Sequence, residues 1–253
     1  MYRPRIIPVL LLKNLGLVKT IDFKNHRYIG DPINAVKIFN DLQADELVFL
    51  DITATKEKRL ISLDFVKNVG DEANMPFSVG GGIKTIDDIK LILNAGAEKV
   101  IINTSAIESP TFIKEAAAVF GSSTIVVCID VKKKVFGGYG IYTTQGTKNT
   151  GLTPVEFSKQ MQEMGAGEII IQSIDNDGIM KGYDIELIRM VSENVTIPVV
   201  ALGGAGTFNH LKEAVETGLA SAAAAGSMFV YHGPRHAVLI NYPSLEELQE
   251  LVS

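Results

Sequence analysis

Short apolar runs rich in β-branched residues alternate with amphipathic segments along this chain, and this alternation restricts the possible folds more than any other feature. Eight runs predict strands: Arg5–Leu12, Glu46–Ile52, Phe77–Val79, Lys99–Asn103, Ile125–Ile129, Glu168–Ser173, Val199–Leu202 and Ala222–Ala225. Segments between them predict helices, among them Pro32–Gln43, Ile86–Ala95, Ser109–Phe120, Pro154–Met164, Ile185–Glu193 and Phe208–Thr217. Strands that alternate with helices form parallel sheets with right-handed crossovers, and near-continuous apolar strands fit a sheet covered on both faces.

Eight such units in 253 residues favour a closed (β/α)8 barrel of the α/β class over an open doubly wound sheet. Because 46% of the residues are hydrophobic, the chain can supply one large core. No shift in composition and no linker divides the sequence. We therefore expect residues 1–253 to form a single barrel domain.

The two halves of the sequence resemble each other. The matching stretches are residues 44–55 with 166–177, and residues 75–105 with 197–227. Gly80 and Gly203, which begin the glycine turns of the second pair, are 123 positions apart. A nearly constant offset across several motifs indicates a barrel built from two similar half-barrels.

Charge and composition exclude several classes of function. A formal net charge of −5 argues against a polyanion-binding surface, so we expect no nucleic-acid partner. No apolar run reaches the roughly 18 residues that span a bilayer, and the N-terminus lacks a secretory signal pattern. The single cysteine, Cys128, cannot form an intramolecular disulfide, and the four histidines show no metal-ligand spacing. We expect a cytoplasmic protein with no metal, no cofactor and no membrane association.

Two glycine clusters follow strands and precede helices: Gly80–Ile83 and Gly203–Gly206. Clustered glycines let backbone N–H groups approach an anion, and barrels commonly bind phosphate in such turns. A tight turn that needs positive φ would explain one cluster equally well. Two clusters at equivalent repeat positions favour a ligand with a phosphate at each end.

Several carboxylates lie at or just beyond the C-terminal ends of predicted strands, where barrel enzymes catalyse their reactions: Asp51, Asp130, Asp175 and Asp177. Any one of them could instead cap the next turn or helix. Asp130 is the strongest candidate because it directly ends an apolar run. The repeat pairs Asp130 with residue 11, which is leucine.

The chain resembles, over almost its whole length, the cyclase subunit of imidazole glycerol phosphate synthase. The stretches that carry the resemblance are RIIP, GDPINA, ADELVFLDITA, VGGGI, AGAEKVIINT, GAGEI, SIDNDG, GYD and GGAG. The resemblance implies a (β/α)8 barrel with a glutaminase subunit docked at its N-terminal face, in a heterodimer. Ammonia then crosses the barrel and reacts with a bisphosphorylated ribulosyl-formimino carboxamide nucleotide.

In that family two aspartates, which end strands one and five, act as general acid and base. Asp130 matches the second, whereas Leu11 stands in the place of the first. A leucine cannot transfer a proton, so a contribution of about 10²–10⁴-fold would be lost unless a neighbour such as Asp51 replaces it. Other polar family positions are also altered, at Ile101, Gln172, Ile179 and Leu202.

The resemblance and the glycine turns together predict a site for a phosphorylated small molecule or another anion. The phosphate-binding residues expected there are Gly81, Gly82, Asn103, Asp177, Gly178, Gly203, Gly204, Gly226 and Ser227.

The family guards its ammonia entrance with four charged residues near the N-terminal ends of strands, and all four are present as Arg5, Glu46, Lys99 and Glu168. A salt-bridged ring that only closes the barrel would use the same residues. An interior group of charges is expensive to bury without a use, which favours an ammonia gate. Glu98 stands where the family has an aspartate that contacts the glutaminase.

An intact entrance with an altered pocket resembles a paralogue group of bacterial surface-polysaccharide (O-antigen or lipopolysaccharide) pathways. Such barrels are thought to work with a glutaminase-like subunit and a sugar amidotransferase that builds an amidino group. The opening LLLKNLGLVKT and the tail at Phe229–Ser244 both fit this group. The tail carries His232, Arg235 and His236, which indicate either a C-terminal helix with a solvated loop or a docking surface.

Three functions remain open at this point. The first is a non-cyclising barrel that conducts ammonia to a sugar amidotransferase. The second is a working cyclase subunit in histidine biosynthesis. The third is a phosphosugar isomerase, which Leu11 disfavours because that chemistry also needs two acids at strand ends.

Overall fold

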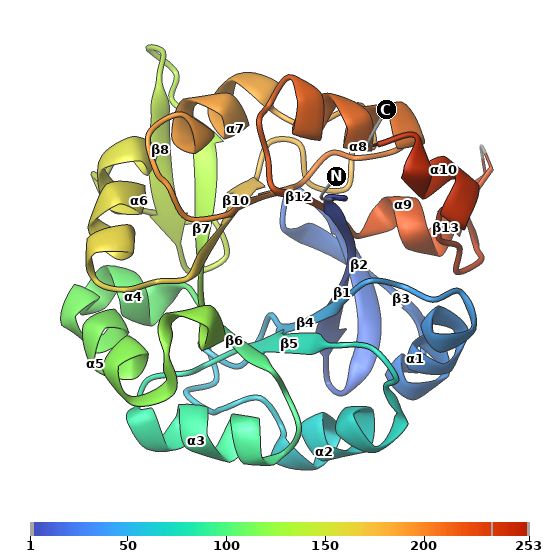
Figure 1. The fold of residues 1–253 in the computed structure, drawn as a ribbon, viewed down its shortest axis with the longest axis horizontal. Helices are drawn as coiled ribbons and strands as arrows, with labels where there is room; N and C mark the ends of the chain where they lie inside the picture. The colour runs from blue at the N-terminus through green and yellow to red at the C-terminus, as the bar shows by residue number, and fades with distance from the viewer. Residues whose placement is uncertain (1–2, 234, 252–253) are drawn as a thin grey trace.

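The computed structural model describes residues 3–233 and 235–251. Eight parallel strands close into a barrel, which confirms the predicted (β/α)8 architecture (Figure 1). In spatial order these strands are β1 (Arg5–Lys13), β4 (Leu47–Asp51), β5 (Phe77–Gly80), β6 (Lys99–Ile102), β7 (Ile125–Lys133), β10 (Glu168–Ser173), β11 (Val199–Leu202) and β12 (Ala222–Ala225). The ladder between β7 and β10 and the ladder between β12 and β1 complete the ring.

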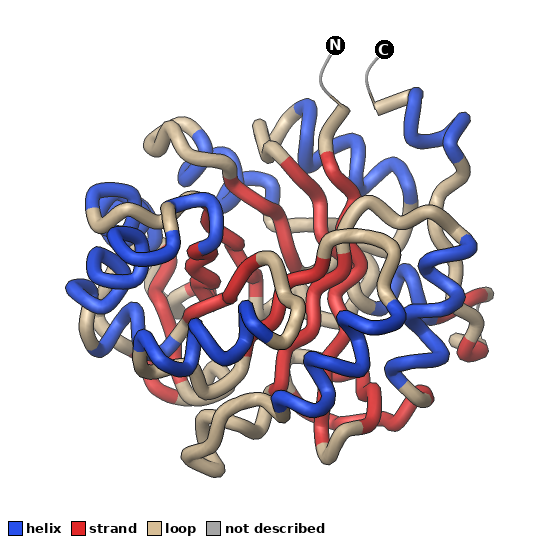
Figure 2. The backbone as a smooth tube through the Cα atoms, turned by 60° about the horizontal axis from the view of Figure 1, so that its bottom comes forward, coloured by secondary structure: helices blue, strands red, loops and turns tan. Residues whose placement is uncertain are grey.

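Helices surround the barrel and cover its outer face (Figure 2). They are α1 (Pro32–Asp41), α2 (Leu63–Glu72), α3 (Ile86–Asn94), α4 (Thr104–Glu108), α5 (Pro110–Phe120), α6 (Pro154–Glu163), α7 (Ile185–Ser192), α8 (Phe208–Glu216), α9 (Ser227–Val230) and α10 (Leu245–Gln249). Several of the longer helices begin with a side-chain cap: Asp31 caps α1, Ser62 caps α2, and Thr85 forms a capping box with Asp88 at α3. The six predicted helices agree with the structure to within one or two residues at their ends.

Two additional hairpins extend from the C-terminal ends of the barrel strands. After β1, the chain forms β2 (Gly16–Ile21) and β3 (Lys24–Gly30), and after β7 it forms β8 (Tyr139–Thr143) and β9 (Lys148–Asn149). Because β7 continues as one arm of its hairpin, it reaches Lys133 rather than ending at Ile129 as predicted. Both hairpins therefore rise from the end of the barrel at which Asp130 lies.

The tail contains more regular structure than a helix and a loop. Strands β13 (Tyr231–His232) and β14 (Ala237–Val238) pair as a small antiparallel hairpin, and α10 follows it. His236 stacks on the ring of Tyr231 at 5.4 Å, and the guanidinium of Arg27 lies 5.6 Å from the same ring. The tail thus contacts the β2–β3 hairpin on the outside of the barrel.

The apolar core has two parts separated by the barrel wall. The larger part lies between strands and helices. The smaller part fills the inside of the barrel with Ile7, Val9, Val48, Ile101, Val126, Cys128, Ile170, Val200, Leu202, Ala222 and Ala224, against which Leu11 and Leu50 pack. The centre of the barrel is therefore lined by alkyl groups between its two polar ends.

Candidate functional site

A cavity of about 390 Å³ opens at the C-terminal ends of the strands, which we call the mouth. Both glycine turns, Gly80–Ile83 and Gly203–Ala205, line this one cavity. Asp130 and Leu11 line it as well, so the structure brings the predicted acid position and the predicted anion sites together. Close to the centre of the barrel its walls are apolar, since Leu50 and Leu202 also reach it.

Leu11 packs against the interior apolar cluster. Its neighbours in the two adjoining strands are Leu50 of β4 and Val18 of β2, both apolar. Leu11 is only half-buried, however, and shares the open cavity with Lys19. The leucine fits its apolar neighbours and leaves this side of the mouth without a proton-transferring group.

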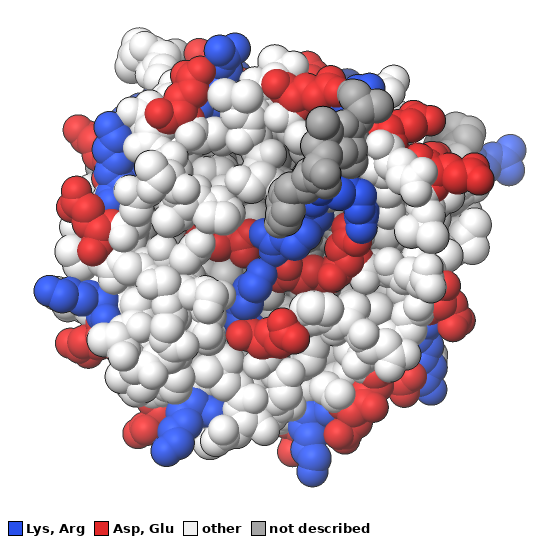
Figure 3. Space-filling model, in the orientation of Figure 1, with Lys and Arg blue, Asp and Glu red and all other residues white. Residues whose placement is uncertain are grey.

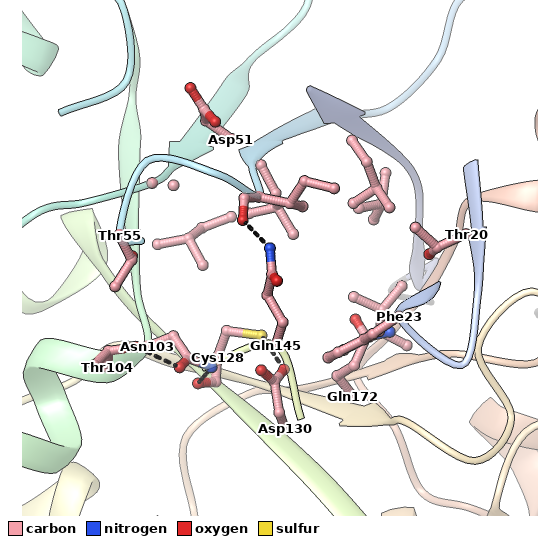
Figure 4. Close-up of a pocket in the computed structure, with 18 of the residues that line it drawn as sticks. Thr20, Phe23, Asp51, Thr55, Asn103, Thr104, Cys128, Asp130, Gln145 and Gln172 are labelled. Carbon is pink, nitrogen blue, oxygen red and sulfur yellow. Dashed lines mark hydrogen bonds between the residues drawn. The ribbon is translucent and has the colours of Figure 1, made fainter. Parts of the chain in front are cut away.

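Asp130 lies on β7 across the mouth, beside Gln172 of β10 (Figure 4). Burial raises the pKa of Asp130 to about 7; hydrogen bonding from Asn103 and Cys128 opposes this shift, and the charge of Asp177 adds to it. The Cys128 sulfur lies 3.8 Å from the carboxylate, and burial raises the pKa of this thiol as well. Near neutral pH, Asp130 can therefore either accept or donate a proton.

Lys19 is a functional-site residue that the sequence reasoning missed. Its side chain is buried at the mouth and donates to the carbonyl of Val9 at 2.7 Å. Burial lowers its pKa to about 8, and the charge of Asp177 opposes that shift. A lysine within the apolar run GLVKTI was the only available signal. It places a positive charge next to Gly226, where a Cβ would come within 2.3 Å of the ammonium nitrogen.

Asp177 anchors the β2–β3 hairpin to the mouth. Its carboxylate accepts from the hydroxyl of Thr20 at 2.7 Å and from the backbone N–H of Phe23 at 3.3 Å. Gln172 donates to the other oxygen at 3.4 Å. The side chain of this predicted phosphate-site residue is thus occupied by the protein, whereas the adjacent Gly178 lines the cavity.

The β8–β9 hairpin reaches the mouth from the opposite side. Gln145 donates to the carbonyl of Ile52 at 2.7 Å, and its side chain crosses the opening in Figure 4. A Cβ on Gly146 would contact both Ile174 and Phe23, so the two hairpins meet over the cavity. Sequence reasoning did not predict either contact.

The glycines of the two turns are required by the protein's own backbone. Gly82 has φ +72°, and a Cβ there would lie 1.8 Å from the carbonyl oxygen of Arg59. Gly204 has φ +113°, and a Cβ there would lie 2.1 Å from the carbonyl oxygen of Gly182. Close packing alone therefore explains these glycines. Their role in binding an anion stays a prediction.

Asn103 and Gly226 precede the short helices α4 and α9, which begin at the cavity. Neither helix has a side-chain hydrogen bond at its N-cap within the described chain. The first backbone N–H groups are therefore available to another acceptor. Lys56, Lys58 and Lys84 also line the cavity, together with the carboxylates of Asp51, Glu108, Asp130 and Asp177, so the mouth carries charges of both signs.

Asp51 has a clear structural role. One carboxylate oxygen accepts from the N–H groups of Thr53 and Ala54, at 3.1 and 3.2 Å. The other pairs with Arg59 at 2.6 Å. Asp51 therefore caps the turn that follows β4, which is one of the two roles that the sequence left open for it. Its replacement of the missing acid stays a prediction, and it would require Asp51 to leave these partners.

The opposite end of the barrel, where the strands begin, holds the four predicted gate residues in one cluster. Arg5 pairs with both Glu46 and Glu168, and Lys99 lies 3.1 and 3.2 Å from the same two carboxylates. Ser78 donates to Glu46 at 2.8 Å. Burial alone would lower the pKa of Arg5, but Glu168 and Glu46 outweigh it and raise that pKa. We call this group the entrance cluster.

Figure 3 shows Lys or Arg and Asp or Glu side chains gathered near the centre of one face of the molecule, with mainly uncharged surface to one side of them. Between the cluster and the apolar interior the structure leaves a cavity of only about 10 Å³, lined by Glu46, Glu168 and Ser78 with Ile7 and Val48 among others. That volume is at the lower limit for one water molecule, about 10–15 Å³. This end of the barrel therefore has no open passage at that cavity in this conformation.

Glu98, the predicted partner contact, is exposed and adjoins Lys99 at the same end of the barrel. No group of three or more His, Cys, Asp or Glu side chains in the described ranges lies close enough together to hold a metal ion. Among those residues, no helix is both long and apolar enough to cross a lipid bilayer.

Comparison with known proteins identifies the fold's relatives. The family described as histidine biosynthesis protein matches residues 5–234. A provisionally named imidazole glycerol phosphate synthase subunit HisF of Leptospira interrogans is 45% identical over 252 residues, 99% of both chains. A provisionally named subunit hisF2 of Pseudomonas aeruginosa is 44% identical, covering 98% of this chain and 99% of that protein. The subunit HisF of Lachnoclostridium phytofermentans is 48% identical, covering 91% and 90%.

Proposed function

Because this chain belongs to the histidine biosynthesis protein family, we propose that it is the cyclase-type barrel subunit of a cytoplasmic glutamine amidotransferase complex. In this proposal a glutaminase subunit binds the entrance end of the barrel. Ammonia passes through the interior to a sugar amidotransferase at the mouth, in a surface-polysaccharide pathway. The barrel itself has lost the cyclase reaction.

One observation carries this proposal: the entrance cluster is complete while the floor of the mouth is alkyl. All four entrance charges are paired with each other, and the interior wall between them and the mouth is apolar. At the far end of that wall, Leu11, Leu50 and Leu202 reach the mouth cavity. Neutral ammonia can cross such a lining, whereas an ammonium ion would pay a large desolvation cost.

The loss of cyclisation follows from Leu11. A step that needs a positioned acid and a positioned base has only Asp130 left on the two strands that should supply them. Asp51, the alternative acid expected from the sequence, is held by Arg59 and two backbone N–H groups. A mouth without the second acid still suits the delivery of ammonia to another protein.

The mouth also fits an anionic ligand. Lys19 and the lysines at positions 56, 58 and 84 bring positive charge to a cavity where two helices begin without side-chain caps. We infer that a phosphorylated small molecule binds between the two glycine turns, with Gly81, Gly82 and Asn103 on one side and Gly203, Gly204, Gly226 and Ser227 on the other.

The glutaminase would dock on the face shown in Figure 3. Glu98 is exposed next to Lys99 of the entrance cluster, and the uncharged surface in the figure can be desolvated at low cost. The relatives are named as subunits, which supports a role within a complex.

A second function, a working cyclase subunit of imidazole glycerol phosphate synthase in histidine biosynthesis, is favoured by Asp130. Its pKa of about 7 suits proton transfer near neutral pH, and Lys19 supplies a second titratable group in the same cavity. The 48% identity to a HisF without a provisional name points the same way.

An activity assay separates these two functions. The purified chain is given ammonium salt and the bisphosphorylated ribulosyl-formimino carboxamide nucleotide, and the imidazole product is measured. We expect no imidazole product from the native chain. Leu11→Asp should also give none, because Gln172 and Leu202 still occupy the altered pocket. Rapid product formation by the native chain would establish the cyclase and remove the first proposal.

A further inference from the structure

The segment after β14 returns to the entrance end of the barrel. It is attached to α9 by two backbone hydrogen bonds, from Leu239 N–H to Val230 and from Asn241 N–H to Phe229, both of 3.0 Å. The ring of Tyr242 then packs on the ring of Phe229 at 5.6 Å. These contacts fix the direction in which the Tyr242 hydroxyl points.

That hydroxyl joins the beginnings of two barrel strands. It donates to the carbonyl of Ile6 at 2.8 Å and accepts from the N–H of Asp45 at 3.2 Å. The carboxylate of Asp45 accepts from the N–H of Ile6 at 2.9 Å, and its other oxygen pairs with Arg3. Burial and the charge of Asp45 raise the pKa of Tyr242, so the hydroxyl stays protonated and can donate.

The side chains of Tyr242 and Asp45 take the place of backbone pairing between β1 and β4 next to Ile6. The ladder between β1 and β4 starts at Val9 opposite Val48, and the same register extended towards the entrance would set Ile6 opposite Asp45. In the described chain, direct backbone pairing of the two strands does not reach so far. The N–H and carbonyl of Ile6 would lack partners there, and the Asp45 carboxylate and the Tyr242 hydroxyl satisfy one each.

The bridged residues are the immediate sequence neighbours of Arg5 and Glu46. We propose that Tyr242 is a positioning residue of the entrance cluster, because its hydroxyl, together with Asp45, holds the backbone of Arg5 against that of Glu46. The inference rests on the proposed function, in which this cluster is the ammonia gate. Through Tyr242, the C-terminal tail would therefore help to hold the residues of the proposed gate in place.

The variant Tyr242→Phe tests this inference in the full chain, since it removes the hydroxyl and retains the ring on Phe229. Nitrogen-15 NMR of arginine side chains should show the protected guanidinium of Arg5 losing its protection. Amide exchange at Ile6 and Asp45 should accelerate about tenfold, as expected when a buried hydrogen bond is lost. The Arg59 signal, from its pair with Asp51 at the mouth, is the internal control.

Tyr231→Phe is the matched control variant. Its ring also belongs to the tail and stacks on His236, but no hydrogen bond of its hydroxyl is among the contacts of the described residues. It should leave both Arg5 and the two amides unchanged. Asp45→Asn, which alters the other half of the bridge, should release Arg5 as Tyr242→Phe does, and it serves as the test if Tyr242→Phe does not fold.

A fall in melting temperature without any change at Arg5 would make Tyr242 merely structural and overturn the inference. The gate function has its own readout, the yield of aminated product per glutamine hydrolysed in the assembled complex. If Tyr242→Phe releases Arg5 and Arg5→Ala leaves that yield unchanged, the positioning role stands and the conduit fails. If Arg5→Ala lowers the yield and Tyr242→Phe leaves Arg5 fixed, only the inference fails.

Discussion

Among single residues, Asp130 gives the clearest dependence on pH. Burial raises its pKa to about 7 in the folded chain, whereas an unfolded aspartate has a pKa of about 3.9. As the pH rises between these values, the unfolded state loses its proton first, so the free energy of unfolding falls. Asp130→Asn removes this loss and should gain up to about 4 kcal/mol relative to the native chain as the pH rises from 4 to 7.

Denaturant unfolding of both proteins at several pH values measures this difference. It should grow through the window and stay constant above about pH 8, where Asp130 is ionised in both states. A difference that does not vary with pH would mean that Asp130 is charged throughout. An Asp130 that is always charged would also no longer support proton transfer at the mouth.

A site residue could be predicted from the sequence when its position in the barrel followed from a predicted strand. Leu11 and Lys99 lie within predicted apolar runs and Asp130 directly follows one, so their place in the barrel followed from those runs. Lys19 did not, because its strand β2 belongs to a hairpin that the alternation of strands and helices does not contain. The glycines were found, but a sequence cannot separate a cradle for an anion from close packing on Arg59 or Gly182.

At the scale of elements, a part-buried hydrogen bond from Thr20 to Asp177 helps to hold the β2–β3 hairpin at the mouth. Thr20→Val removes the hydroxyl that donates to Asp177 at 2.7 Å and leaves the carboxylate short of a partner. We expect a loss of about 1–2 kcal/mol in hairpin stability, seen as faster amide exchange at Asp22 and Phe23. Both of these N–H groups also bond to Asp177.

Thr55→Val is the matched control, since Thr55 lines the same cavity and its hydroxyl has no hydrogen bond to another residue in the described ranges. Its effect on the hairpin amides should be negligible. Equal acceleration in both variants would show that the hairpin is not held by Asp177.

The hairpins are also the elements that the sequence did not predict. The run Ile125–Ile129 gave most of the barrel part of β7. The continuation pairs with β10 up to Val131, and its polar end up to Lys133 pairs with β8. In the same way, the tail forms strands only because Tyr231 and Val238 meet across a turn. Pairing between distant or polar segments leaves no periodic apolar pattern, whereas the barrel strands and their helices do.

For the whole molecule, the proposal predicts that its two ends can be separated by mutation. Lys99→Ala leaves Glu46 and Glu168 with Arg5 as their only cationic partner in the cluster, which should cost about 3 kcal/mol of folding stability. In a complex with the glutaminase and the sugar amidotransferase, glutamine hydrolysis should continue while less aminated sugar forms per glutamine. The mouth, at the other end of the apolar interior, should bind its anion unchanged.

Lys37→Ala is the control for the loss of a lysine, because its ion pair with Glu72 lies on the surface at 3.8 Å. It should change neither stability nor yield by much, as exposed pairs contribute about 0–1 kcal/mol. If Lys99→Ala lowers stability and the yield per glutamine stays at the native value, the entrance cluster only closes the barrel. The four charges, of which Glu46 and Glu168 are buried, would then serve the fold alone, and the apolar interior would be a packed core that carries nothing.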